Sequence, residues 1–335
     1  MLTLSQFYQS IFGCKTYKIS LDAGCTCPNR DGTKGSGGCI FCSEAGSGDF
    51  IFGRSLTVTA QIEQGKKLVE AKLRGRSGER RGKYIAYFQS FTSTYGDAKL
   101  LLEKYREALQ FEGVAGLAVA TRPDCLSDEI LRGLAAISHE HFVQIELGLQ
   151  TSNETTGRLI NRCYTNEDYI DAVHRIRNAA PEIHIVTHLI FGLPGETEED
   201  MLNSVKFVLE QSHPAETKEN HPAETKESHT AETKESHPAE TKESHPELVS
   251  GSSFGLKITS LYVLQNTRLA VMYDAGEYEP LSKEQYFNLL KNALTLLPEN
   301  CVVHRLTGDP PKKLLIAPAW PADKKRVLNE LSKLF

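Results

Sequence analysis

The sequence predicts an α/β protein in which six parallel strands, each followed by a helix, form a partial, laterally open (β/α)6 barrel. Two observations support this prediction. Strand-like and helix-like patterns alternate along the chain, which is typical of a parallel sheet covered by helices. Polar residues follow the ends of successive strands, as in barrels whose site lies at the carboxyl ends of their strands. Six units are too few to close an eight-stranded barrel, so we expect one open side.

Each predicted element follows from the pattern of apolar residues. Short runs rich in β-branched and aromatic residues predict strands, at 17–21, 84–88, 116–120, 142–147, 184–191 and 256–263. Amphipathic stretches between them have the spacing of helices and lie at 58–73, 98–111, 128–137, 166–179 and 197–211. Ser127 and Asn166 are predicted to cap two of these helices, because each is a short polar residue followed by acidic residues that favour the positive end of the helix dipole.

A low-complexity insertion interrupts this pattern. The octapeptide HPAETKES and its close variants recur four times between His213 and Ser244. The repeat has almost nothing apolar to bury, and its prolines interrupt a helix. We therefore predict that residues 212–252 are disordered. The core then comprises residues 1–211 and 253–280, with a cysteine-containing loop at 23–55, and residues 281–335 form a small C-terminal extension.

Composition and charge place the chain among ordinary globular proteins. Hydrophobic residues make up 40% of the chain, and the formal net charge is −5, most of it from the repeats. The remainder is nearly neutral, so bulk charge does not indicate a nucleic-acid binder. Residues 66–83 are a local exception, with eight Lys or Arg against two Glu, which fits either a solvated helix end or an RNA-contacting patch.

The sequence also predicts the compartment. No apolar run approaches the ~20 residues that a membrane-spanning helix needs. The first residues, MLTLSQFYQS, lack the basic flank and apolar run of a signal peptide. We therefore expect a cytoplasmic protein with no membrane partner.

Four of the eight cysteines, Cys25, Cys27, Cys39 and Cys42, lie within 18 residues of one another. In a protein of this kind such a group is more often a metal site than a set of disulfides. Two sites fit the spacing. All four thiolates could surround one zinc ion, or three could hold an iron–sulfur cluster whose remaining iron stays open to a ligand. The scattered Cys125, Cys163 and Cys301 are predicted to be buried apolar residues.

Seven segments carry a family resemblance: CPNRDG, GGCIFC, YIAYFQSFTSTY, ATRPDCL, ELGLQT, HLIFGLPGE and HRLTGDPP. Together they resemble the radical S-adenosylmethionine (SAM) proteins of the YhcC/YtqA type, with an Elp3-like radical SAM core. CSEAGSGDF and RLTGD resemble the YtqA branch more closely. The resemblance implies a TIM-like radical SAM barrel and a [4Fe-4S] cluster held by Cys27, Cys39 and Cys42, with Cys25 outside the ligand set. It also implies that SAM binds the open iron and is cleaved after one-electron reduction by a flavodoxin- or ferredoxin-type donor.

The resemblance further assigns six residues to SAM binding: Phe41, Glu146, Gln150, Arg162, Gly192 and Gly195. The phenylalanine and the glycines are expected beside the adenine, since glycine lets the backbone approach a ring. The glutamate and glutamine are expected at the ribose or methionyl part, and the arginine at the SAM carboxylate. The structural alternatives are a turn that leads into a helix for the glycines, a buried polar network for the strand residues, and a surface position for the arginine.

Other polar residues have less defined roles. Arg122 and Asp124 are predicted to form a fixed pair at the barrel mouth, and His188 to be a satisfied core histidine. His304 and Arg305 are candidates for the substrate side. Thr259, Tyr262 and Gln265 stand where the family typically has His, His and Lys, which puts substrate contacts on that strand in doubt.

The resemblance to the YtqA branch implies a substrate, the carboxymethylaminomethyl side chain of a tRNA wobble uridine, which is trimmed towards aminomethyl. Two alternatives accompany this expectation. One is a radical SAM enzyme that acts on a small molecule or a peptide. The other is a zinc-stapled RNA-binding or adaptor protein without catalysis.

Overall fold

A computed structural model describes residues 1–46, 56–73, 82–212 and 254–333 of the chain. The predicted disordered insertion lies outside the described residues except for Ser212, the last residue of α7 (Glu198–Ser212). Residues 47–55 of the cysteine-containing loop and residues 74–81 of the basic stretch also lie outside them.

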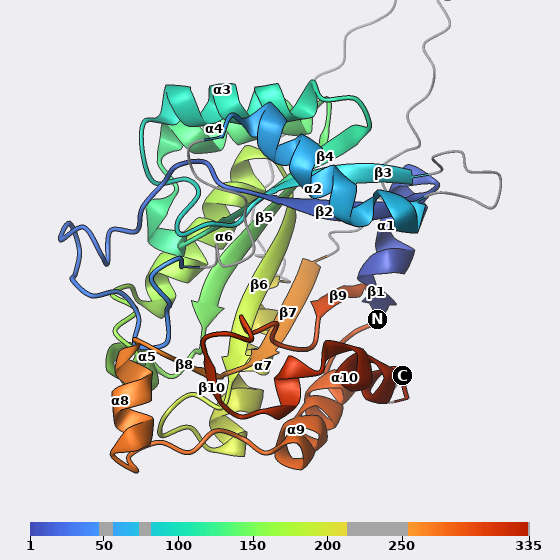
Figure 1. Cartoon of the computed structure of the whole chain (residues 1–335). Helices are drawn as coiled ribbons and strands as arrows, with labels where there is room; N and C mark the ends of the chain where they lie inside the picture. The colour runs from blue at the N-terminus through green and yellow to red at the C-terminus, as the bar shows by residue number, and fades with distance from the viewer. Residues whose placement is uncertain (47–55, 74–81, 213–253, 334–335) are drawn as a thin grey trace, which may run out of the picture.

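One curved sheet of eight parallel strands forms the centre of the fold (Figure 1). The six predicted strands follow one another in chain order across this sheet: β2 (Lys15–Leu21), β3 (Gly82–Phe88), β4 (Val114–Thr121), β5 (Phe142–Gln150), β6 (His184–Phe191) and β7 (Phe254–Ser260). Adjacent members of this series pair in parallel. The predicted partial α/β barrel is therefore confirmed.

The sheet continues beyond the six predicted strands. β9 (Cys301–Arg305) pairs with β7, and β1 (Leu2–Thr3) pairs with β9, both in parallel. β9 thus places part of the predicted C-terminal extension inside the barrel sheet. β1 and β2 are the two edges, so the sheet does not close on itself.

Helices cover the outer face of the sheet (Figure 1). The predicted ones are α2 (Val58–Leu73), α3 (Ala98–Leu109), α4 (Asp128–Ser138), α6 (Asn166–Ala179) and α7, and α9 (Lys283–Thr295) extends the series. Ser127 caps α4 as predicted, because its side chain accepts the N–H of Ile130. The cap of α6 is Thr165 rather than Asn166, because Thr165 and Asp168 form a reciprocal capping box one residue earlier.

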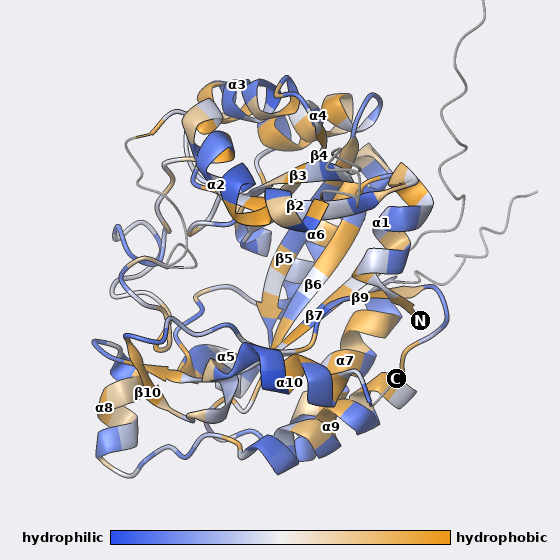
Figure 2. Ribbon diagram, turned by 45° about the vertical axis from the view of Figure 1, so that its right-hand side comes forward, coloured by the Kyte–Doolittle hydropathy of each residue, from blue (hydrophilic) through white to orange (hydrophobic). Residues whose placement is uncertain are grey.

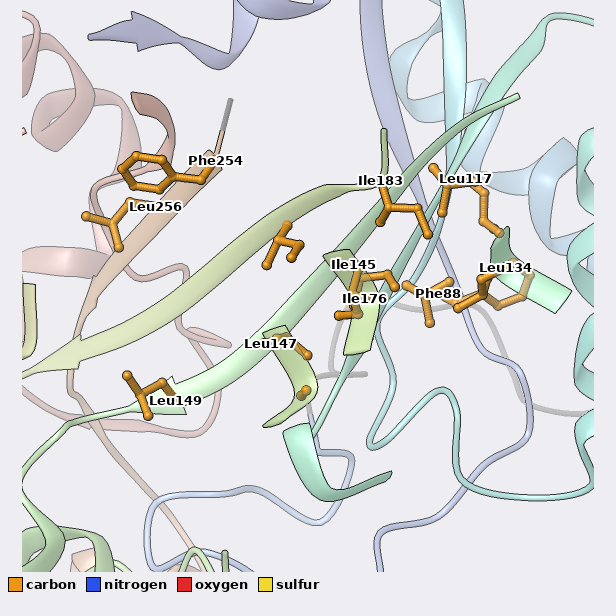
Figure 3. Close-up of a cluster of buried hydrophobic side chains, with 14 of the residues drawn as sticks. Phe88, Leu117, Leu134, Ile145, Leu147, Leu149, Ile176, Ile183, Phe254 and Leu256 are labelled. Carbon is orange, nitrogen blue, oxygen red and sulfur yellow. The ribbon is translucent and has the colours of Figure 1, made fainter. Parts of the chain in front are cut away.

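The main hydrophobic core lies between the sheet and this outer layer. Phe88, Leu117 and Ile145 point outward from their strands and meet Leu134 of α4 and Ile176 of α6 (Figure 3). The outer helices, such as α3 and α10 (Lys324–Leu331), are largely hydrophilic on their exposed sides, which are blue in Figure 2. Hydrophobic residues, in orange, are concentrated in the strands. None of the helices in the described part of the chain is long and apolar enough to cross a membrane.

α1 (Leu4–Phe12) plugs the amino-terminal end of the barrel. It contacts both β2 and β9, which lie at opposite sides of the open sheet. Phe7 packs on Phe142 and His184 with ring centroids 6.1 and 4.5 Å apart, and the Tyr8 hydroxyl donates to Gln144. These inward-facing aromatic rings close the barrel at its floor.

Smaller elements surround the other end of the barrel. They are α5 (Glu154–Leu159), α8 (Arg268–Asp274), the short helices Pro123–Cys125 and Trp320–Ala322, and an antiparallel pair of β8 (Val263–Leu264) and β10 (Leu315–Ala317). Ile40 of the cysteine-containing loop packs among residues of this group, including Leu261 and Leu269. The loop is thereby fixed at the carboxyl ends of the strands.

Deleting residues 213–244 is expected to leave the fold intact and to change the melting temperature by a few degrees at most. The repeats offer little apolar surface, and loop closure costs only about 0.6 kcal/mol per doubling of length. Thermal unfolding and iron content after anaerobic reconstitution measure the effect, with a glycine–serine segment of equal length as the control. A deletion variant that misfolds would show that the repeats belong to the core.

Candidate functional site

A cavity of about 420 Å³ lies on the concave side of the sheet. Alternate strand residues line it, such as Glu146, Gly148 and Gln150 of β5 and Lys257 and Thr259 of β7, because successive side chains of a strand point to opposite faces. Phe41 and Cys42 line the same cavity from the cysteine-containing loop. The loop and the barrel interior therefore share one space.

The loop that follows β2 owes its shape to glycines and turns. The N–H of Arg30 bonds to the carbonyl of Cys27, and the N–H of Cys42 bonds to that of Cys39. Gly37 and Gly38 both have positive φ, at 77° and 74°, directly before Cys39. This left-handed backbone is costly for residues with a Cβ, so the two glycines set the direction in which Cys39 enters the site.

Cys27, Cys39 and Cys42 approach one another at the mouth of the barrel. Burial, with the nearby thiols of Cys42 and Cys27, raises the pKa of Cys39 to about 12 in the absence of a metal. Two N–H donors face the sulfurs, with Asn29 Nδ2 3.9 Å from Cys39 Sγ and Arg122 Nη1 3.9 Å from Cys27 Sγ. Three partly exposed thiols with N–H groups around them fit an iron–sulfur cluster, in which each thiolate binds its own iron.

Cys25 belongs to a different part of the structure. It is 5% exposed and packs in the main core, where it lies near Tyr105 of α3. Among the described residues, no three Cys, His, Asp or Glu side chains gather as a site for a single metal ion. The arrangement therefore does not support a zinc ion held by all four cysteines.

Arg122 and Asp124 form the predicted pair. The guanidinium donates to both carboxylate oxygens at 2.9 and 2.8 Å, and Lys34 binds the same carboxylate at 2.6 Å. Although burial opposes ionisation, these cations hold the pKa of Asp124 below its usual range. The pair fixes Arg122 between the carboxylate and the sulfur of Cys27.

Glu146 is the centre of a buried network inside the barrel. Its Oε1 accepts from Lys18 at 2.5 Å and from Gln144 at 2.8 Å, while Oε2 accepts from Tyr87 at 2.5 Å and from Lys257 at 3.2 Å. Burial opposes ionisation, but Lys18 and Lys257 hold its pKa well below the usual range. Glu146 thus belongs to a buried polar network, which is the structural alternative predicted for it. Its contact with SAM stays a prediction.

Gln150 lines the cavity and carries a hydrogen-bonding atom without a partner. Its Oε1 is buried without a partner, and its backbone has a φ of 72° at an irregularity in the pairing of β5 with β6. Such strain in a residue other than glycine is typical of functional sites. The contact of Gln150 with SAM stays a prediction.

Arg162 occupies a position that differs from the predicted one. It is fully buried, and its five N–H groups go to the carbonyls of Tyr164, Leu149 and Thr151 and to the side chains of Glu154 and Asn166. A guanidinium has only five such donors, so none is left for a ligand carboxylate. The structure thus contradicts both the predicted pairing with SAM and the surface alternative.

Of the three predicted adenine contacts, Phe41 lines the cavity, whereas Gly192 and Gly195 do not. Both glycines have positive φ in the turn that leads into α7, and the carbonyl of Gly192 accepts from Tyr278 at 2.8 Å. The two glycines therefore form the turn that the structural alternative predicted. Their contact with adenine stays a prediction.

The remaining candidates divide between the cavity and its surroundings. His188 is satisfied by Thr259 at 2.9 Å, as predicted, but it lines the cavity together with Thr259 and Tyr262. Arg305 also lines the cavity, whereas His304 lies behind it and pairs with His184 at 2.8 Å. Gln265 is exposed and absent from the cavity wall.

The prediction of buried cysteines outside the cysteine-containing loop is only partly confirmed. Cys301 is buried. Cys125 and Cys163 are partly exposed instead, and each meets a polar group, Asp124 Oδ1 at 3.5 Å and Asn29 Oδ1 at 3.3 Å respectively. Their prediction as buried apolar residues is wrong because both lie in the polar loops that surround the mouth.

Sequence reasoning missed Lys18, Tyr87 and Lys257, which line the cavity and bind Glu146. The signal was present, since Lys18 and Lys257 each stand between apolar residues in a strand that helices cover. A charged residue in such a strand needs a buried partner.

A profile of the radical SAM superfamily matches residues 29–208, and one of the radical SAM C-terminal domain matches residues 254–334. The chain belongs to the radical SAM superfamily. It is a radical SAM enzyme, and the family implies a [4Fe-4S] cluster and SAM, which fit the three neighbouring thiols, of which Cys42 lines the cavity. The zinc-stapled protein without catalysis is thereby excluded.

Relatives cover the chain over nearly its whole length. YtqA of Bacillus subtilis is 34% identical over 331 residues, which are 99% of this chain and 88% of YtqA. YhcC of Escherichia coli is 27% identical and covers 96% of this chain and 88% of YhcC. These matches confirm the resemblance to the YhcC/YtqA type.

Solved structures show the same fold at low identity. Elp3 of the archaeon Methanocaldococcus infernus, with an N-terminal deletion, has a TM-score of 0.60 at 15% identity and covers 95% of this chain. This chain in turn spans 63% of the Elp3 chain, less than two thirds. The hydrogenase maturase HydG has a TM-score of 0.50 at 9% identity, with 88% of this chain and 53% of HydG covered.

Proposed function

We propose that this radical SAM enzyme acts on the carboxymethylaminomethyl side chain of a tRNA wobble uridine and trims it towards aminomethyl. The observation that carries the proposal is the shared cavity, which joins the loop of Cys42 to polar side chains deep in the barrel. A group of substrate that reaches into this cavity lies between the cluster loop and the charged interior. A modified uridine in an unpaired anticodon is a group of that kind, because unpaired bases can be splayed into protein pockets.

The residues have separable roles in this proposal. Cys27, Cys39 and Cys42 hold the cluster, and Arg122 donates towards the sulfur of Cys27. Phe41 and Gln150 face SAM at the mouth. When bound, the cluster and SAM supply a one-electron reductant and a carbon radical that removes a hydrogen atom from substrate. A flavodoxin- or ferredoxin-type protein is proposed as the electron donor.

RNA as the substrate class has two supports. The tRNA-2-methylthio-N(6)-dimethylallyladenosine synthase of Acetivibrio thermocellus is 31% identical over 142 residues, 41% of this chain and 29% of that protein. The basic stretch 66–83 supplies cations for phosphates; α2 carries Lys66, Lys67 and Lys72 of it. Its four arginines lie outside the described residues.

The test is an anaerobic reaction of the reconstituted enzyme with SAM, a reductant and tRNA that carries the modified uridine. We expect 5′-deoxyadenosine to form and the wobble nucleoside to become aminomethyluridine, both measured by mass spectrometry. The binding of tRNA should weaken steeply with salt, since contacts to phosphates release counterions. Formation of 5′-deoxyadenosine with an unchanged nucleoside would contradict the tRNA substrate and favour a small molecule or a peptide.

A further inference from the structure

The cavity carries more positive than negative charge. Four cationic side chains line it, namely Lys18, Arg122, Lys257 and Arg305, together with the carboxylates Glu146 and Asp309. Arg122 is neutralised by Asp124, and Asp309 by Lys324, which lies outside the lining. Within the described lining, one carboxylate therefore remains for three cations, an excess of two positive charges.

Glu146 positions the two lysines but cannot neutralise both. Lys18 from β2 and Lys257 from β7 reach the same carboxylate at 2.5 and 3.2 Å, one on each oxygen. Tyr87 and Gln144 also donate to these oxygens. Lys257 makes the longer of the two ion pairs, and its ammonium has two further N–H groups.

Arg305 has no counter-charge among the residues that the structure describes. It stands at the end of β9, is exposed, and lines the cavity. Across the described part of the chain, no carboxylate or hydrogen-bond acceptor is found for its guanidinium. Burial lowers the pKa of Lys257, Glu146 opposes that change, and Arg305 lowers the pKa further, so the two cations are close enough to repel each other.

The nearby histidines add no charge. Burial and Lys257 hold the pKa of His188 well below its usual range, and burial and Lys18 do the same for His304. The excess charge is thus confined to the lysines and Arg305. An anion is the group that relieves such repulsion, and a guanidinium matches the geometry of a carboxylate or a phosphate.

We propose that Lys257 and Arg305, with Glu146 and Lys18 as positioning residues, bind an oxyanion of the substrate inside the barrel. This inference rests on the proposed function because it takes the cavity as the substrate site. The carboxylate of the carboxymethylaminomethyl group and a phosphate of the RNA backbone present the same chemistry. The site makes the enzyme selective for substrates with a negative charge close to the carbon that is attacked.

The first arm of the test needs no RNA. Thermal unfolding of the reconstituted protein with SAM is measured in malonate or inorganic phosphate, against chloride at equal ionic strength. Malonate, phosphate or both should stabilise the wild type, because a ligand that binds only the folded state raises stability. Arg305→Gln and Lys257→Met should need at least tenfold more of the anion, the effect of losing one charge-assisted hydrogen bond.

The control for this arm is Arg132→Gln, the same change at an exposed arginine on α4, outside the cavity lining. It should respond as the wild type does. An equal response of wild type, Arg305→Gln and Arg132→Gln to both anions would overturn the proposal, whatever the natural substrate is. Stabilisation by phosphate alone identifies a backbone phosphate as the source, and stabilisation by malonate identifies a carboxylate.

The second arm compares anticodon stem–loops that carry the carboxymethylaminomethyl group or its neutral methyl ester. Wild type and Arg132→Gln should prefer the carboxylate at least tenfold, and Arg305→Gln should lose that preference. If both stem–loops bind equally well and are both processed, the proposed function stands and a carboxylate site fails. If neither stem–loop binds while malonate stabilises the protein, the anion site stands and the tRNA substrate fails.

Discussion

Replacing Cys39 by alanine is expected to remove nearly all bound iron and to abolish the cleavage of SAM, whereas Cys25→Ala retains both. Cys39 lies with the thiols of Cys27 and Cys42 at the cavity mouth, while Cys25 packs in the core behind the sheet. A cluster that loses one of its three thiolates has an iron without its protein ligand. Iron and sulfide per chain after anaerobic reconstitution measure the difference.

Cys25→Ala serves as the matched control, since it removes the same atom from the same loop. Circular dichroism of both variants before reconstitution shows whether the barrel is folded. Equal loss of iron from Cys25→Ala and Cys39→Ala, with both variants folded, would show that the three-thiol ligand set is wrong.

Replacing Arg162 by methionine is expected to lower the free energy of unfolding by about 3–5 kcal/mol, because three carbonyls lose their donor and a buried acceptor without a partner costs about 1–3 kcal/mol. Methionine retains most of the volume but none of the donors. The carbonyls of Leu149, Thr151 and Tyr164 would each lose a partner, and the segment between β5 and α6 would lose its anchor. Denaturant unfolding of the protein without its cluster measures the change.

Arg158→Met on α5 is the control, because Arg158 is exposed and its side chain, within the described ranges, donates only to Thr155. It should change stability by less than about 0.5 kcal/mol. Equilibrium dialysis of SAM against the reconstituted variants separates the two roles. Unchanged stability with weaker SAM binding in Arg162→Met would restore the predicted contact with the SAM carboxylate.

The central strands were predictable because each carries its own signal. Strands β2 to β7 are seven to nine residues long with apolar residues at regular positions, and an amphipathic helix separates most neighbours. β1 has two residues, too few for any periodicity, and it forms only because β9 offers an edge to pair with. β9 has only three apolar residues before His304 and Arg305, which is too short a run to predict a strand.

The cluster loop was predictable for a related reason, since Cys27, Cys39 and Cys42 lie close together along the chain. The charged interior was not. Glu146 meets Lys18 across 128 residues and Lys257 across 111, and the contact depends on the register of β5 relative to strands that are not its neighbours. A one-residue shift of register would turn these side chains to the opposite face. Arg162 was misassigned because its acceptors are mainly backbone carbonyls, which no sequence motif marks.

The pairing of β1 with β9 also constrains the order in which the molecule can assemble on the ribosome. Leu2 pairs with Val302, so the first strand of the sheet along the chain has as its partner the strand of that sheet that is synthesised last. Contacts so distant along the chain form slowly, because a long loop must close before they stabilise anything. The strands from β2 to β7 can associate in the order of their synthesis, but the pair of β1 and β9 must wait until β9 has been synthesised. Nascent chains therefore carry an unsealed sheet edge beside β7, where pairing with another copy competes with completion of the fold.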